Sequence, residues 1–82
     1  MQTGQDRLRK LRWKSRRGMK ELDVLLEAFL DKHSDALLGG DWQELEWFLE
    51  QEDDVLFDWI SGRSLPTNPD LLRLIKTLTH VI

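Results

Sequence analysis

The chain has 82 residues and a formal net charge of −3, with 40% hydrophobic and 33% charged residues. This size predicts a single domain over residues 1–82, and the composition excludes both a disordered chain and a membrane-embedded one. There is no cysteine, which excludes a disulfide framework, a thiol nucleophile and a cysteine-ligated metal.

Charge is distributed unevenly along the chain. Residues 1–20, the basic arm, hold eight basic side chains and one acidic one, whereas residues 21–60 hold thirteen acidic side chains and one basic one. A folded chain divided in this way is expected to have a strong dipole that orients partners during encounter. A basic arm containing Trp13 also suits phosphate contacts and base stacking, but the acidic body would repel a nucleic acid, so we expect no such partner.

The first half of the chain predicts two helices. A short basic helix is expected over about Asp6–Lys14, after flexible residues 1–5. From about Met19 to Lys32, apolar side chains recur three and four residues apart, which is the period of an amphipathic helix. Its buried face is expected to comprise Leu22, Leu25, Leu26, Phe29 and Leu30. Two consecutive glycines at 39–40 then interrupt the helical pattern.

Three further helices are expected after this break, each from its end signals. Asp41 is placed to cap the first, because Glu44 follows three residues later as in a capping box. Carboxylates at 52–54 suit the first turn of the second, and Gly62 suits its end. Asn68, followed by proline, begins the third. No segment alternates in polarity, so the sequence predicts an all-α fold, a compact five-helix bundle in a single domain.

Four tryptophans are many for a chain of this length. Trp59 falls on the apolar face of its helix and is expected in the core. Trp42 lies one turn before the apolar stripe that begins at Leu45, which is compatible with burial. Trp47 falls between the stripe positions of its helix, so it is expected at the surface, where tryptophan is a frequent anchor for binding partners.

Patterns typical of catalysis or metal binding are absent. His33 and His80 have no metal-binding spacing, so we expect both on the surface and no bound metal. The acidic residues at 50–58 match no calcium loop and are expected to form a solvated face and a helix start. No serine has an adjacent histidine base, and no glycine-rich phosphate loop occurs. We therefore expect no enzymatic activity and no cofactor held by the chain itself.

The most unusual local feature is the segment Arg16–Asp23, in which a glycine precedes the strongest predicted helix. In a local interpretation, Gly18 turns the chain between helices, and Glu21 complements the helix N-terminus and pairs with Arg17 across one turn. In a functional interpretation, Gly18 lets the backbone of a partner approach while Arg17 and Glu21 hydrogen-bond to it. The residues alone leave the two interpretations evenly balanced.

Two signatures make the chain resemble the SdhE/YgfY family, the bacterial relatives of succinate dehydrogenase assembly factor 2. Residues 17–21, Arg-Gly-Met-Lys-Glu, resemble the Arg-Gly-x-x-Glu signature of that family, and Trp13 and Arg16 stand upstream of it. Residues 54–60, Asp-Val-Leu-Phe-Asp-Trp-Ile, resemble a second signature. The resemblance covers residues 7–80, nearly the whole chain.

The resemblance implies a chaperone-like FAD assembly factor. Such a protein binds the flavoprotein subunit of succinate dehydrogenase, and in bacteria also that of fumarate reductase, and promotes covalent flavinylation of a partner that carries the FAD. The family motif implies that Arg17, Gly18 and Glu21 contact the partner, with Arg16 and Asp23 as flanking contacts. An antitoxin-like regulatory partner of a membrane toxin protein is the alternative. With no secretory signal before the motif, we expect a bacterial cytoplasmic protein.

Overall fold

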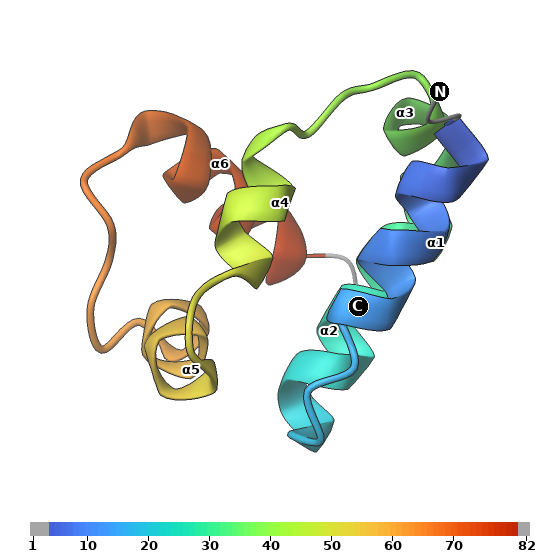
Figure 1. Cartoon of the computed structure of the whole chain (residues 1–82). Coiled ribbons are helices and arrows are strands. Elements are labelled where there is room, and N and C mark those ends of the chain that lie inside the picture. The colour runs from blue at the N-terminus through green and yellow to red at the C-terminus, as the bar shows by residue number, and fades with distance from the viewer. Residues whose placement is uncertain (1–3, 81–82) are drawn as a thin grey trace.

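The computed structural model of the protein describes residues 4–80, which form six helices and no strand (Figure 1). The helices are α1 (Gly4–Lys14), α2 (Lys20–Lys32), α3 (Ser34–Leu38), α4 (Glu44–Leu49), α5 (Asp53–Ser61) and α6 (Pro69–Leu78). The all-α prediction is confirmed, and the short helix α3 adds a sixth to the five expected. Of the segment expected to be flexible, residues 4–5 belong to α1, and residues 1–3 lie outside the described part.

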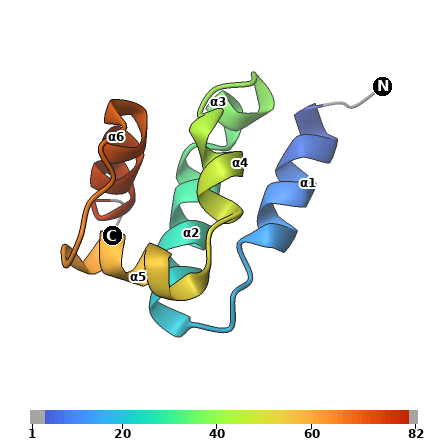
Figure 2. The ribbon, with the colours of Figure 1, turned by 60° about the vertical axis from the view of Figure 1, so that its left-hand side comes forward.

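Helix α4 lies between α1 and α6 (Figures 1 and 2). Helix α1 lies beside α2 and packs against α3, and α4 contacts α1 on one side and α6 on the other. Helix α5 lies across one end of the molecule, and the loop between α1 and α2 lies at the same end (Figure 2). This arrangement brings the segment with the Arg-Gly-x-x-Glu motif next to the junction between α4 and α5.

One hydrophobic core receives side chains from all six helices. Its buried members are Leu11, Leu22, Leu26, Phe29, Leu30, Leu37, Leu45, Phe48, Leu49, Leu56, Leu71, Leu74, Ile75 and Leu78. Four of the five side chains expected on the buried face of α2 are buried, and Leu25 is half-buried. Each buried leucine or phenylalanine contributes about 1.5–3 kcal/mol before the entropy of ordering is subtracted.

Two of the predicted helix ends are confirmed. Gly62 follows α5 with a φ of 84°, the left-handed conformation that a glycine adopts without strain. Asn68 caps α6, because its side-chain oxygen accepts a hydrogen bond from the N–H of Asp70 at 2.8 Å. These local signals therefore fix the loop between the last two helices.

The start of α4 differs from the prediction. Asp41 does not cap the helix, which begins at Glu44 with Gln43 at the N-cap position and no side-chain cap. The cause is Trp42, which has a φ of 60° and whose ring packs edge-on against Phe29, with 5.2 Å between ring centroids. An N-cap is worth about 1 kcal/mol, which is less than the burial of an aromatic ring contributes, so packing decides the path of the chain.

His33 is half-buried rather than fully on the surface as predicted. Its ring lies at the junction of α2 and α3, with its centroid 4.6 Å from that of Phe29 and 5.6 Å from that of Trp42. Its Nε2 is buried and has no hydrogen-bond partner in the described part of the chain. Burial, assisted by the charge of Lys32, lowers the pKa of His33 below its usual value. His80 is exposed, as expected.

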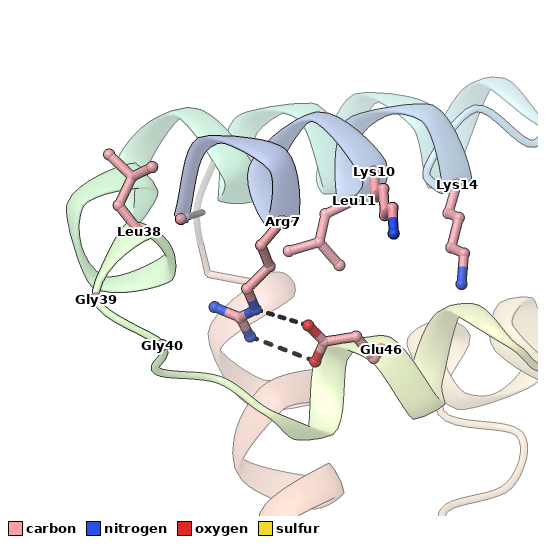
Figure 3. Close-up of a pocket in the computed structure, with 9 residues that line it drawn as sticks. Arg7, Lys10, Leu11, Lys14, Leu38, Gly39, Gly40 and Glu46 are labelled. Atoms are coloured by element: carbon pink, nitrogen blue, oxygen red, sulfur yellow. Dashed lines mark hydrogen bonds and ion pairs between the residues drawn. The ribbon is translucent and has the colours of Figure 1, made fainter. Parts of the chain in front are cut away.

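The basic arm is joined to the acidic body rather than set apart from it. Arg7 of α1 faces Glu46 of α4, with its Nε 2.6 Å from the carboxylate (Figure 3). The Arg7 guanidinium also donates to the carbonyl oxygens of Leu37 and Trp42, at 2.5 and 3.2 Å. Further ion pairs between the two segments are Arg12–Asp31, Lys14–Glu50 and Arg17–Asp53. The fold thus pairs much of the charge from which we expected a strong dipole.

Candidate partner-binding site

The candidate site is the motif loop, residues 15–19, together with the first turn of α2. Ser15 ends α1: its N–H donates to the carbonyl oxygen of Leu11 at 2.9 Å, and its hydroxyl donates to that of Arg12 at 2.7 Å. Ser15 is buried, so the loop leaves α1 from a fixed point. The residues that follow point in two directions, some into the molecule and some toward solvent.

Arg17 points inward and ties the motif loop to the junction between α4 and α5. Its guanidinium donates to the carbonyl oxygens of Leu49 and Gln51, the second at 3.2 Å, and lies 3.4 Å from the carboxylate of Asp53. The side chain is only 16% exposed. These contacts occupy carbonyl groups left open at the C-terminal end of α4. The expected pairing of Arg17 with Glu21 across one turn is not formed, and Arg17 acts as a positioning residue.

Asp23 closes the motif loop from the side of α2. Its Oδ1 accepts a hydrogen bond from the backbone N–H of Arg17 at 2.8 Å, which spans the loop. Its own N–H donates to the carbonyl oxygen of Met19 at 2.9 Å. Asp23 and Arg17 are both partly buried, so much of their hydrogen-bonding capacity is used within the chain. Both residues therefore fix the shape of the loop.

Gly18 lies at the exposed turn of the motif loop with a φ of 77°, a conformation that other residues adopt only with strain. No heavy atom lies within 4 Å of the position that a β-carbon would take. The glycine is therefore required by the backbone conformation and not by crowding within the chain. The open space beside it leaves the backbone of the loop accessible to a partner.

Arg16 and Glu21 point outward. Both are exposed, and neither side chain makes a hydrogen bond or ion pair within residues 4–80. Glu21 lies in the first turn of α2, where its charge favours the helix N-terminus. The sequence-predicted site residues are thus divided: Arg17 and Asp23 hold the loop, whereas Arg16, Gly18 and Glu21 are exposed at the surface.

Ion pairs leave few free charges around the loop. The Lys14 ammonium hydrogen-bonds to the Glu50 carboxylate at 2.8 Å, and this bond and the lysine charge lower the pKa of Glu50. The Arg12 guanidinium lies 2.8 Å from the Asp31 carboxylate, and the Arg17 guanidinium is held by Asp53 and by backbone carbonyls. Arg16 and Lys20 are the cations of this region without a partner among the described residues. The site therefore offers separate positive and negative groups and an accessible backbone, which suits hydrogen bonding to another protein.

Trp13 is a further candidate residue at this site, beyond those that the sequence motif indicates. It is 76% exposed, more than any other large hydrophobic side chain of the described part. It lies on the last turn of α1 and lines a shallow hollow together with Arg16 and Arg17. The available signal was its phase, because Trp13 falls off the stripe formed by Leu8 and Leu11.

Within residues 4–80, no group of three or more histidine, aspartate or glutamate side chains is placed to hold a metal ion. In the same range, no helix combines the length and the apolar character needed to cross a membrane. The exposed motif loop is therefore the candidate site of the described chain.

Known proteins similar to this chain agree with the resemblance carried by the two signatures. The model of the Sdh5 family, described as the flavinator of succinate dehydrogenase, matches residues 9–82. The FAD assembly factor SdhE of Coxiella burnetii is 36% identical over 73 residues, covering 89% of each chain. That of Pseudomonas aeruginosa is 39% identical over 71 residues, covering 87% of this chain and 84% of the relative. No solved structure matches significantly. The match begins within α1 and includes the motif loop and all the later helices, and the chain belongs to the Sdh5 family of succinate dehydrogenase flavinators.

Proposed function

We propose that this chain is an FAD assembly factor that binds the flavoprotein subunit of succinate dehydrogenase and promotes covalent attachment of FAD to it. Family membership supports this function, as do relatives that are themselves FAD assembly factors. The structural observation that carries it is the motif loop. Arg17 and Asp23 hold the loop from within, while Gly18 remains exposed on it and Glu21 remains exposed beside it, in the first turn of α2.

In this proposal the bond to FAD is formed by groups of the client, and the assembly factor acts by binding. A ligand shifts a conformational equilibrium only by the difference between its affinities for the two states. The factor would therefore bind more tightly to the client conformation in which FAD attachment proceeds. A loop that is already fixed loses little conformational entropy on binding, which leaves more of its contact energy for this selection.

Each exposed group of the motif has a specific task in such a complex. The Glu21 carboxylate accepts hydrogen bonds from N–H groups or pairs with a cation of the client. Gly18 lets the client backbone approach, because no side chain stands between it and the loop. In this proposal FAD itself stays on the client. Two further statements remain predictions: fumarate reductase is a second client, and the protein acts in the cytoplasm.

The test is flavinylation of purified flavoprotein subunit, prepared without covalent FAD and incubated with FAD and the assembly factor. We expect Glu21→Ala to lower the yield of covalently bound flavin strongly, read as in-gel fluorescence, because the exposed carboxylate is lost. The stability of the variant should fall by only about 0.3–1 kcal/mol, the usual effect of an acidic residue in a first helical turn.

Asp70→Ala is the matched control, since Asp70 is an exposed acidic residue in the first turn of α6. It should flavinylate the client as the wild type does. Normal flavinylation by a folded Glu21→Ala variant would contradict a role of Glu21 in client binding and would leave it only a local role at the start of α2.

A further inference from the structure

An exposed tryptophan stands beside the motif loop and is not used by the fold. The Trp13 side chain is 76% exposed and makes no hydrogen bond or aromatic ring contact within the described residues. Trp47 is also exposed, at 52%, but its ring stacks on that of Trp59 with 6.2 Å between centroids. An indole that is largely exposed in the free protein gains the most from burial against a partner, and tryptophan is enriched among the residues that dominate binding energy.

The surroundings of Trp13 connect it to the motif. The hollow that Trp13 lines is also lined by Arg16 and Arg17, and by Leu49 and Glu50 from the end of α4. A second hollow, on the side of α2, includes Arg16 and Gly18. Arg16 therefore lies between the two hollows, and one partner surface that covers Gly18 and extends over Arg16 reaches Trp13.

Charge around the indole selects the kind of partner. Lys14 is paired with Glu50, and Arg17 is held by Asp53 and backbone carbonyls, so Arg16 is the free cation of this hollow among the described residues. A nucleic acid needs several phosphate contacts, and the acidic side chains here compete for the cations that would supply them. A single free cation beside a large apolar group instead complements an apolar protein cleft with a carboxylate at its rim.

We propose that Trp13 and Arg16 form a second contact with the flavoprotein client, which rests on the function proposed above. The indole of Trp13 enters an apolar cleft of the client, and the Arg16 guanidinium pairs with a carboxylate beside that cleft. The fixed end of α1 holds Trp13 beside the motif loop, so this anchor and the contacts of Gly18 and Glu21 are made together.

Calorimetric titration of purified flavoprotein subunit with the assembly factor tests this inference. Trp13→Ala should raise the Kd at least tenfold, Trp13→Phe should restore part of the affinity, and Trp47→Ala should change the Kd less than twofold. Arg16→Glu should also weaken binding, with a loss that shrinks as salt concentration rises. Arg9→Glu is its control, because the Arg9 side chain is 79% exposed on α1. Melting curves should show all variants folded, since none of these changes removes a buried side chain.

The outcomes separate this inference from the proposed function. If the wild type binds and Trp13→Ala binds equally well, only the Trp13 contact is overturned. If the wild type does not bind the flavoprotein subunit, the proposed function and this contact fail together. Single-stranded RNA binding that is lost in Trp13→Ala, with client affinity unchanged, would assign the indole to a nucleic acid instead and overturn the inference.

Discussion

Arg17 and Gly18 are adjacent in the motif, yet the structure gives them different tasks. The Arg17 side chain is turned inward onto the end of α4, whereas Gly18 leaves an open backbone at the surface. A loss of function on replacing Arg17 would therefore combine a deformed loop with any lost contact to a client. Glu21 is exposed and its side chain makes no hydrogen bond or ion pair among the described residues, so it is the cleaner probe of binding.

Replacing Gly18 by valine should destabilise the domain. At a φ of 77° a residue with a β-carbon is strained by about 1–2 kcal/mol, and a β-branched one is least suited to this region. Gly18→Asn is the matched control, because asparagine enters the left-handed region more readily and should cost less. Urea unfolding measures both changes. Equal midpoints for the two variants would show that residue 18 does not hold a left-handed conformation in solution.

Stability should depend on pH through His33. Burial lowers its pKa in the folded state, so the unfolded chain binds more protons between that lowered pKa and the ordinary value of 6.5. The free energy of unfolding should consequently fall as pH drops below about 6.5 and level off below the folded pKa. Above that range both states are neutral at His33, and the residue makes no pH-dependent contribution.

Urea unfolding between pH 5 and 7.5 measures this effect, with His33→Phe as the comparison. Phenylalanine preserves packing against Phe29 and Trp42 but does not titrate. The slope of stability against pH should therefore be smaller in the variant. An identical slope in both proteins would assign the pH dependence to other groups.

At the scale of helices, α1 is attached in a different way from the others. Leu11 is its one buried core residue, so polar contacts carry much of the attachment. Arg7 joins α1 to α4 and to the segment around α3, and Gly4 lies so close to α3 that a β-carbon there would overlap the carbonyl oxygen of Leu38. The position of Trp13 and of the motif loop therefore depends on these few contacts.

Arg7→Ala should lower the free energy of unfolding by about 1.5–3 kcal/mol. The Arg7 side chain is largely buried and donates to Glu46 and to two backbone carbonyls, and hydrogen bonds that involve charged groups are worth this much. Arg9→Ala is the control, since an exposed side chain on the same helix should change stability by no more than about 0.5 kcal/mol. Chemical denaturation compares the two, and equal losses would contradict the role of Arg7 as the link between α1 and α4.

Across the whole molecule, features set by local chemistry could be predicted and features set by tertiary packing could not. The face of α2 and the ends around Gly62 and Asn68 follow from side chains within a few residues. Helix α3 has five residues, too few for a periodic pattern to show. The turn at Trp42 is determined by a ring contact with Phe29, thirteen positions earlier in the chain, which no local pattern contains.

The candidate site shows the same limit. The sequence located the motif loop, but it could not separate inward from outward side chains, because Arg17 is held by groups more than thirty positions away. The exposure of Trp13 follows only weakly from the sequence, because the apolar stripe that it falls off consists of Leu8 and Leu11 alone. Opposite charges in distant segments of the sequence predicted a strong dipole for the folded chain. The fold instead brings many of these charges together as ion pairs.

The whole molecule is a small helical domain whose distinctive exposed feature is a loop fixed from within, which suits a protein that acts by holding another. Deleting the gene and measuring covalent flavin in the succinate dehydrogenase flavoprotein subunit, by in-gel fluorescence, tests this function most directly. We expect the flavoprotein of the deletion strain to carry strongly reduced covalent flavin, restored by the wild-type gene but not by Glu21→Ala. A full complement of covalent flavin in the deletion strain would contradict the proposed function.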